Sequence, residues 1–271
     1  MKATPKQTLV AAALIAALAA SAAARAEESE EAIAKATQNP IAAMISAPFQ
    51  YNYDQNIGPQ RTGTKNYMNV QPVIPISISE DWNLISRTIL PVVTQTSVVA
   101  GSGTQSGIGD ITQSLFFSPK KPTEGGLIWG VGPVFLLPTA SNNQLGGEKW
   151  GAGPTAVMLK QESGWTYGML ANHIWSIAGT SNRSDISSTF LQPFLSYTTK
   201  TYMTFGVNTE STYNWEAKNW SVPINLSVTQ LLKVGNQRFT LQAGARYWAD
   251  SPDAGAHGWG ARFAVTFLFP K

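Results

Sequence analysis

Five charged side chains stand within segments that otherwise alternate apolar and small polar residues: Arg87, Asp110, Glu210, Arg246 and Arg262. Each falls on the polar side of the alternation, so all five would share the water-facing interior of a closed sheet. A fixed charge acts strongly on a passing ion in a narrow passage of low dielectric constant. Three arginines against one aspartate and one glutamate predict a weak preference for anions, if the passage is open.

The last two of these charges belong to one predicted hairpin. Folding that hairpin about Ala254 would set Arg246 directly opposite Arg262, which makes them neighbours in the interior. The alternative is that the five charges pair with one another and fill the interior of a modest-sized barrel, so that no solute passes. Both interpretations remain open at this point.

The sequence offers little for catalysis. His173 and His257 are the two histidines that could act as a base, and no Ser-His pair with an orienting acid is recognisable. We therefore predict no enzyme, no catalytic residues and no cofactor, with an outer-membrane hydrolase as a remote alternative. Asp250, Asp253 and His257 share one loop, but Asp amid Ser, Pro and Gly is ordinary turn chemistry, so no metal site is predicted.

Composition narrows the class of protein. The 271 residues contain no cysteine and only 13% charged residues, about half the usual share of roughly 25%. Residues 1–26 are predicted to be a secretory signal peptide, with Lys2 and Lys6 before an apolar stretch and Ala24-Arg25-Ala26 as the cleavage site. Without the three basic residues of this leader, 16 basic residues face 16 acidic ones, so nothing points to nucleic acid.

The rest of the chain has no apolar run long enough for a membrane helix. Instead, residues 47–271 divide into twelve alternating segments separated by turn-forming clusters. They are centred on Phe49–Tyr53, Met68–Ile78, Trp82–Thr94, Asp110–Phe117, Leu127–Leu137, Trp150–Lys160, Trp165–Ile177, Thr189–Tyr197, Tyr202–Tyr213, Trp220–Gln230, Arg238–Trp248 and Trp259–Phe269. This pattern predicts an all-β fold, a single closed transmembrane antiparallel β-barrel of about twelve strands in the Gram-negative outer membrane.

Loop lengths support the same fold. Short links such as Gln161–Gly164 alternate with longer ones such as Asp54–Asn66 and Gln95–Gly109, as expected for periplasmic turns and external loops. All nine tryptophans fall at strand ends and are predicted to form an aromatic girdle at the headgroup level: Trp82, Trp129, Trp150, Trp165, Trp175, Trp215, Trp220, Trp248 and Trp259.

Seven prolines oppose this fold, because each removes a donor from a strand ladder: Pro72, Pro75, Pro91, Pro133, Pro154, Pro193 and Pro223. Residues 27–46 precede the first strand. They are predicted to be a short periplasmic segment, either a helix that reaches into the lumen as a plug or a mobile tail.

Several strings carry a family resemblance, among them Ile45-Ser46-Ala47-Pro48-Phe49-Gln50, Gln71-Pro72-Val73-Ile74-Pro75, Gly130-Val131-Gly132-Pro133 and Leu137-Pro138-Thr139-Ala140. From about Asn39 onward the chain resembles the exported β-barrel proteins grouped with the meta-pathway phenol-degradation family, which are described as transporters. The resemblance implies an outer-membrane location, a transport role and passage of hydrophobic or aromatic compounds. It also implies that the prolines are features of the fold.

We therefore expect a passive outer-membrane channel for small molecules. The alternatives are a non-conducting structural or surface-interaction barrel and, in third place, the hydrolase. The expected partners are the lipid bilayer, the outer-membrane insertion machinery and a small solute that the sequence does not identify; it does not indicate an oligomeric state either.

Overall fold

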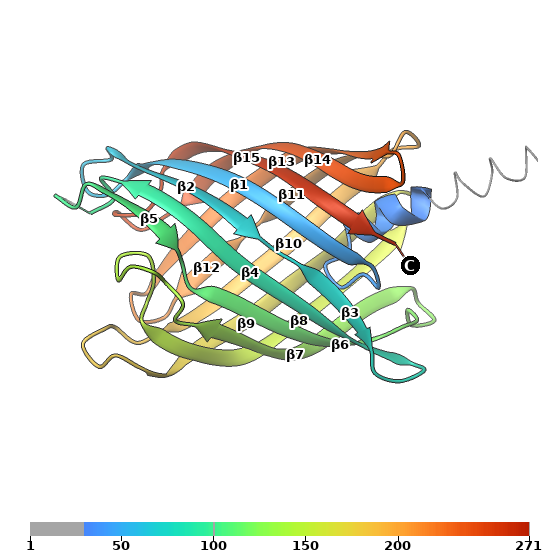
Figure 1. The fold of residues 1–271 in the computed structure, drawn as a ribbon, viewed down its shortest axis with the longest axis horizontal. Coiled ribbons are helices and arrows are strands. Elements are labelled where there is room, and N and C mark those ends of the chain that lie inside the picture. The colour runs from blue at the N-terminus through green and yellow to red at the C-terminus, as the bar shows by residue number, and fades with distance from the viewer. Residues whose placement is uncertain (1–29, 100, 271) are drawn as a thin grey trace, which may run out of the picture.

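The computed structural model describes residues 30–99 and 101–270, so the predicted signal peptide lies outside the described residues. The described chain folds into a closed barrel of twelve antiparallel strands (Figure 1), which confirms the predicted fold class. Fifteen β-strands occur in the described residues, because three of the twelve barrel strands are each interrupted once. All twelve predicted segments coincide with barrel strands.

The strands follow one another around the barrel. The three interrupted barrel strands are β2 with β3, β5 with β6, and β11 with β12. The bounds are β1 Ile45–Ile57, β2 Gly63–Val70, β3 Val73–Ser77, β4 Trp82–Thr96, β5 Thr104–Ile108, β6 Ile111–Pro119, β7 Leu127–Leu137, β8 Lys149–Glu162, β9 Trp165–Gly179, β10 Ser187–Thr198, β11 Met203–Thr209, β12 Ser211–Asn214, β13 Asn219–Val234, β14 Gln237–Asp250 and β15 Gly258–Phe269.

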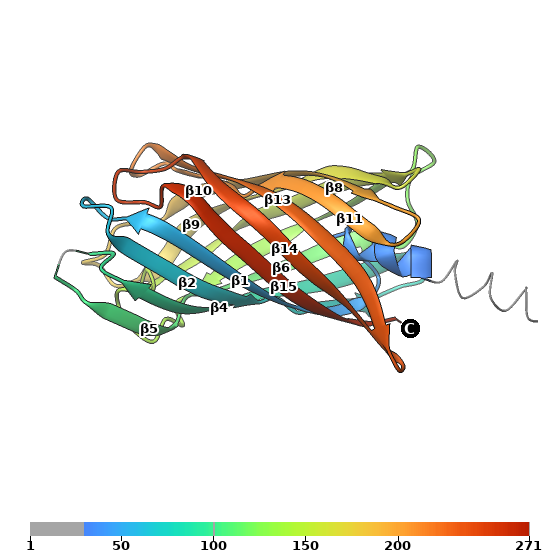
Figure 2. The same cartoon turned by 90° about the horizontal axis from the view of Figure 1, so that it is seen from above.

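The sheet closes because the last strand, β15, pairs with β1 from Ile45↔Phe269 to Tyr53↔Ala261. All strands are tilted against the barrel axis (Figure 2). Both described chain ends lie at the end of the barrel that carries the short turns, the periplasmic end by the rule for such barrels. No helix within residues 30–99 or 101–270 is long and apolar enough to cross a membrane.

Two of the predicted external loops are shorter than expected. The strands around Asp54–Asn66 continue to Ile57 and resume at Gly63, and those around Gln95–Gly109 continue to Thr96 and resume at Thr104. In the second hairpin, Thr94 and Thr96 pair with Ser106 and Thr104 across the strands through hydroxyl contacts of 3.0 Å. Such polar pairs stabilise a hairpin beyond the apolar belt, where apolar alternation no longer marks the strand.

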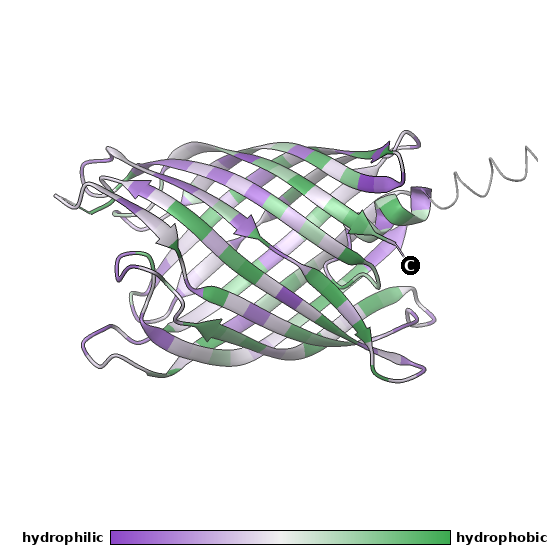
Figure 3. Cartoon of the chain, viewed as in Figure 1, coloured by the Kyte–Doolittle hydropathy of each residue, from purple (hydrophilic) through white to green (hydrophobic). Residues whose placement is uncertain are grey.

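Apolar and polar side chains alternate between the two faces of the wall, as the last hairpin illustrates. Leu241 and Phe263 point outward and are 44% and 54% exposed, whereas Thr240 and Arg262 point inward and are 4% exposed. The alternation of hydrophobic and hydrophilic residues along the strands is visible in Figure 3. A closed sheet leaves no unpaired edge, so an apolar outer face can lie in lipid without exposing backbone polar groups.

The seven prolines lie where a ladder is already interrupted. Pro133 of β7 and Pro154 of β8 face each other across the two strands. The backbone N–H that each proline lacks would point to the strand on the other side, β6 for Pro133 and β9 for Pro154. In these two ladders the pairing skips the residues around Pro133 and Pro154. The other five stand at a strand break, a register shift or an unpaired stretch: Pro72, Pro75, Pro91, Pro193 and Pro223. Bulges and ladder breaks therefore accommodate the prolines.

The glycine before each facing proline is required by close packing. A Cβ on Gly153 would overlap the carbonyl oxygen of His173, and one on Gly132 would overlap that of Leu115. We expect Gly153→Ala to lower the free energy of unfolding by about 1–3 kcal/mol, because β9 must move away. Urea unfolding of the barrel in lipid vesicles, followed by tryptophan fluorescence, measures this. Gly125→Ala is the control, since the nearest neighbour of its Cβ is 4.0 Å away; equal losses in both variants would contradict the close-packing argument.

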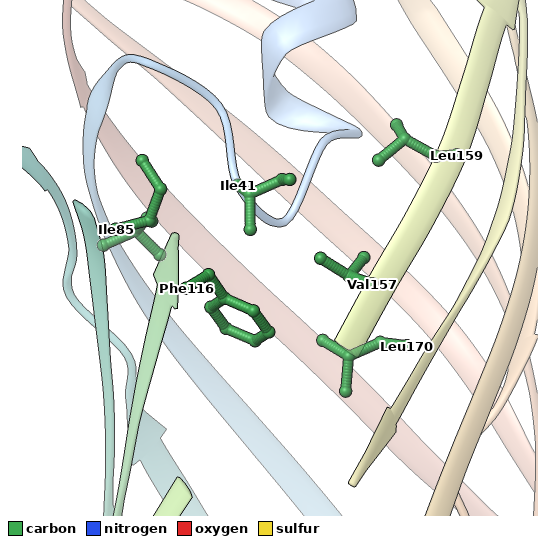
Figure 4. Packing of buried hydrophobic residues seen from close by; sticks show 7 residues of the cluster. Ile41, Ile85, Phe116, Val157, Leu159 and Leu170 are labelled. Atoms are coloured by element: carbon green, nitrogen blue, oxygen red, sulfur yellow. The ribbon is translucent and has the colours of Figure 1, made fainter. Parts of the chain in front are cut away.

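The N-terminal segment packs inside the periplasmic end of the barrel. Residues 30–37 form a short helix, and the chain then passes through the lumen to β1. Ile41 is 4% exposed and lies between Ile85 and Phe116 on one wall and the side chains of β8 and β9 on the other (Figure 4). Ile33, Ala34 and Met44 form a second buried cluster with Leu231 and Leu268. We call residues 30–44 the plug segment.

Polar contacts also hold the plug segment to the wall. The Arg238 guanidinium lies 2.7 Å from the Glu30 carboxylate, and Gln161 donates a hydrogen bond of 2.8 Å to the Lys35 carbonyl oxygen. The segment is thus fixed by two apolar clusters and by contacts to opposite parts of the barrel.

Candidate functional site

An ion-pair cluster lies in the lumen above the plug segment. At its centre, Glu210, between β11 and β12, accepts two hydrogen bonds from Arg262 of β15, at 3.0 and 2.6 Å. This two-point geometry suits a guanidinium and a carboxylate, and both residues face inward. Arg262 also donates to Asn52 Oδ1 at 2.8 Å, its direct cross-strand neighbour on β1.

Arg246 of β14 completes the cluster. Its guanidinium lies 3.6 Å from Glu210 and 3.7 Å from Asp54, and it donates to the Tyr67 hydroxyl. It also lies over the Trp248 ring, 4.7 Å from the centroid. Arg246 and Asp54 are each 4% exposed, so both charges are buried and both depend on these partners.

The two arginines are neighbours, but not direct partners. The register pairs Arg246 with Gly260 and Arg262 with Gly244, so the prediction that Arg246 stands opposite Arg262 is wrong. The register is centred on residue 253 and not on Ala254, because the last pair of the hairpin is Trp248 with Gly258 and residues 249–257 connect the two. Arg246 and Arg262 both stay on the inward face, because the observed partner of Arg246, Gly260, differs from the predicted partner, Arg262, by an even number of residues.

Arg87 of β4 also faces the lumen but stands apart from this cluster. Within the described residues its side chain makes one hydrogen bond, to Gln71 Oε1 at 3.1 Å, and no ion pair within 4.0 Å. Two cavities in the lumen, of about 240 and 270 Å³, meet at this level. Arg87, Gln50, Gln71 and Gln192 line both, so these four side chains separate the cavity beside the plug segment from the one above it.

Asp110 has a different role from the other four predicted charges. Its carboxylate accepts hydrogen bonds from the backbone N–H of Ala140 at 3.1 Å and of Gly147 at 2.6 Å. Both amides belong to the external loop between β7 and β8, and Asp110 lines neither lumenal cavity. The structure therefore places Asp110 as a support for this loop, outside the charge cluster.

A neighbouring loop, residues 180–186, is held by similar contacts. Arg183 donates to the carbonyl oxygen of Asn143 at 2.7 Å, which joins the two loops. Lys149 lies 2.9 Å from Asp185, and this hydrogen bond holds the pKa of the Asp185 carboxyl below its usual value. The contact is therefore present at neutral pH and is lost as the pH falls through that lowered pKa.

Most of the predicted aromatic girdle points to the outside. Trp82 and Trp129 form an edge-to-face pair at the periplasmic end, with ring centroids 5.8 Å apart. Six further tryptophans are exposed on the outer surface or its loops: Trp150, Trp165, Trp175, Trp215, Trp220 and Trp259. Trp248 is the exception. Its Nε1 donates to Asp54 at 2.9 Å, so its ring lies in the lumen with Arg246.

The assignment of Trp248 to the girdle is therefore wrong, and its position in the strand explains why. Trp248 is two residues from Arg246 and shares its inward face, whereas Tyr247 and Trp259 are outward neighbours with ring centroids 5.0 Å apart. The girdle was predicted from closeness to strand ends alone. The alternation of β14 would have placed Trp248 inside.

We expect Trp248→Phe to lower the free energy of unfolding by about 1–3 kcal/mol, because a buried carboxylate loses a donor. Trp259→Phe, at a 58% exposed outer position, is the matched control and is expected to cost about 0.5 kcal/mol or less. Brominated phospholipids give a second measurement. These lipids should quench the fluorescence of Trp259→Phe less than that of the wild type, because this variant has lost an outward-facing tryptophan. In Trp248→Phe the part of the fluorescence that the lipids quench should be the same as in the wild type. A smaller quenched part in Trp248→Phe would contradict the inward placement of Trp248.

The sequence interpretation missed four members of the cluster: Asn52, Asp54, Lys65 and Tyr67. Asp54 and Lys65 are cross-strand neighbours on β1 and β2, in a part of the hairpin that was assigned to a loop. The Lys65 ammonium joins the cluster over the Tyr67 ring, 5.5 Å from the ring centroid. Asn52 lies inside the predicted segment on the same face as Asp54, and continuing the alternation one residue past Tyr53 would have revealed Asp54.

The histidines are placed away from the cluster. His173 Nδ1 lies 2.7 Å from the Thr189 hydroxyl on the outer face of the barrel. His257 lies in the loop before β15, where its backbone N–H donates to the Gln55 carbonyl oxygen. Among residues 30–99 and 101–270 no three His, Asp or Glu side chains are grouped so that they could hold a metal ion.

Comparisons with known proteins identify the fold. No family model matches the chain, and no curated protein matches its sequence. The solved structures include the COG4313 outer membrane channel from Pseudomonas putida F1, with a TM-score of 0.65 and 14% identity over 84% of this chain and 96% of that one. Outer membrane phospholipase A from Escherichia coli has a TM-score of 0.49 at 8% identity over 83% of this chain and 90% of that one. The KdgM porin has a TM-score of 0.42 at 13% identity over 83% and 99%.

The first of these likenesses agrees with the fold derived above. This chain is a closed twelve-stranded β-barrel of the outer membrane, and at 14% identity the likeness shows the fold alone. None of the comparisons tests the grouping with the meta-pathway phenol-degradation proteins, which stays a prediction.

Proposed function

We propose that this barrel is a passive channel for small molecules, closed at rest by the plug segment. The observation that carries the proposal is the pair of lumenal cavities, because a barrel filled only for stability has no need for two adjoining spaces lined by amides and an arginine. The plug segment enters the lumen from the periplasmic end as one continuous piece. Its displacement would connect the cavities with the periplasm.

The charges of the lumen support a preference for anions. Lys65, Arg87, Arg246 and Arg262 face inward, with Asp54 and Glu210 as the acids of this region. This leaves an excess of two positive charges in this part of the lumen, where Arg87 and Glu210 line the cavities directly. A fixed charge acts strongly on ions in a narrow passage. By its resemblance to the phenol-degradation group, the proposal extends to hydrophobic or aromatic molecules as the transported class.

A non-conducting barrel is the second candidate, favoured by the mutual pairing of Arg262 and Glu210 and by the depth of the plug segment. Recordings across planar bilayers and swelling of solute-loaded liposomes separate the two. The channel proposal expects single-channel events or swelling above that of empty liposomes. Their absence, both in the wild type and in a variant with a displaced plug segment, would favour the non-conducting barrel.

We propose no enzymatic activity. His173 is 4.0 Å from the Trp175 ring by centroid distance and borders lipid, where its Nδ1 contacts a threonine. Incubation with phospholipid, with and without calcium, checks this interpretation. Fatty-acid release that disappears in both His173→Ala and His257→Ala variants would contradict it.

A further inference from the structure

Arg87 differs from the other lumenal arginines in its lack of a carboxylate partner. Arg246 has two carboxylates within 3.7 Å and Arg262 has one at 2.6 Å, whereas Arg87 has none within 4.0 Å in the described part of the chain. A guanidinium has five N–H donors in a planar fork, and a single hydrogen bond to Gln71 uses one of them. Its other donors are available to a ligand at the meeting point of the two cavities.

The cavity above Arg87 has a polar and an apolar part. Gln50, Asn69 and Gln192 line the same cavity as Arg87, and the NH₂ group of a side-chain amide can donate to an anion. Ile89, Ile174 and Phe190 contribute hydrocarbon surface to the same cavity. The volume of about 270 Å³ lies just below the usual range of roughly 300–1,000 Å³ for small-molecule sites. It admits a molecule with one ring or a short chain.

We propose that Arg87 and the surrounding amides form a binding site for a small organic carboxylate, with its hydrocarbon part against Ile89, Ile174 and Phe190. The inference deepens the proposed function and rests on it, because a lumenal site serves transport only if solutes pass. A carboxylate matches the planar fork of an arginine with two parallel hydrogen bonds. The amides of β1 and β10 would complete its coordination from opposite walls of the barrel.

Glu210 also lines this cavity, and an uncompensated carboxylate there would repel an anionic ligand. Both of its oxygens accept from Arg262, and Arg246 lies 3.6 Å away. Two arginines therefore compensate its single charge. Arg87 feels Glu210 only from beyond ion-pair distance and has no carboxylate within 4.0 Å in the described residues. This arrangement favours an anion over a neutral or cationic ligand beside Arg87.

The test uses the purified full-length protein in detergent and fluorine NMR of 4-fluorobenzoate, with 4-fluorobenzamide as the neutral analogue of the same size. We expect saturable binding of the carboxylate and at least about tenfold weaker binding of the amide, as a charge-assisted pair of hydrogen bonds predicts. Arg87→Gln should weaken carboxylate binding by about the same factor. Arg87→Lys, which keeps the charge but not the fork, should lie between the two.

Arg183→Gln is the matched control. It removes an arginine of the external loops that lines neither cavity, so carboxylate binding should not change. No binding to the wild-type protein, equal binding of acid and amide, or equal effects of Arg87→Gln and Arg183→Gln would each overturn the proposal. A difference in gel migration between unheated and boiled samples reports that each variant is folded.

Binding and transport can fail separately in this design. Carboxylate binding that depends on Arg87, in a barrel without conductance or swelling, would support the site and contradict the channel. Conductance without Arg87-dependent binding would support the channel and overturn the carboxylate site.

Discussion

Ile41→Asp is expected to convert the resting barrel into an open one. Ile41 is 4% exposed between Ile85, Phe116 and the aliphatic side chains of β8 and β9. An ionised carboxylate in such surroundings costs on the order of several kcal/mol, because the cluster that encloses Ile41 is made of apolar side chains. About 3 kcal/mol would shift the balance between the inserted and displaced plug segment by on the order of 100-fold. Single-channel conductance and liposome swelling should both rise.

Ala43→Asp provides the control, since it adds the same charge two residues away, where the side chain is exposed. This variant should behave like the wild type. The barrel should stay folded in both variants, because the twelve strands close independently of the plug segment. Unchanged conductance in Ile41→Asp, or equal increases in both variants, would show that insertion of Ile41 does not close the lumen.

The architecture could be predicted from the sequence because the outer face of the barrel must be apolar. Phe263, Phe267 and Leu241 on the outside alternate with Arg262, Thr266 and Thr240 on the inside, and this period of two requires a strand. The prolines could not be placed in advance. Their ladder breaks depend on which residue faces which, as Pro133 and Pro154 show, and that register is set by the loops.

The candidate site could be predicted only in part. Alternation gave Arg87, Glu210, Arg246 and Arg262 one common face, but it does not say which of them touch. Contact depends on the shape of the barrel, which brings Glu210 to Arg262 from a strand three positions away around the sheet. The same shape leaves Arg87 without a carboxylate within 4.0 Å in the part of the chain that the structure describes. Asp110 also falls on the polar side of the alternation, yet its carboxylate binds the backbone of an external loop. The alternation of residues along a strand does not predict the conformation of a loop.

Glu210→Gln and Arg262→Gln are expected to change ion selectivity in opposite directions. The first removes a negative charge from a lumen with a positive excess and should raise the permeability of anions relative to cations. The second removes a positive charge and should lower it. At about 7 Å from a passing ion and an effective dielectric constant near 40, one charge is worth roughly 1 kcal/mol, a several-fold change in the permeability ratio. Reversal potentials in a salt gradient measure it.

These recordings are best made in the Ile41→Asp background, so that the lumen conducts in every variant. Lys200→Gln removes a basic residue from an exposed periplasmic turn and is the control. Shifts of the same sign in both charge variants would exclude a direct electrostatic effect of the cluster.

Stability provides a second readout of the same pair. Loss of the Glu210 carboxylate leaves Arg262 without an ion pair within 4.0 Å in the described residues and leaves Arg246 with Asp54 alone. Glu210→Gln should therefore cost on the order of 3 kcal/mol, the low end of the range for a broken buried pair, because Glu210 keeps 21% of its side chain exposed. Arg262→Gln should cost less, because Glu210 keeps Arg246 at 3.6 Å. This asymmetry follows from the geometry alone. Urea unfolding in lipid vesicles should therefore rank the wild type above Arg262→Gln and Arg262→Gln above Glu210→Gln, even in a barrel that conducts no ions.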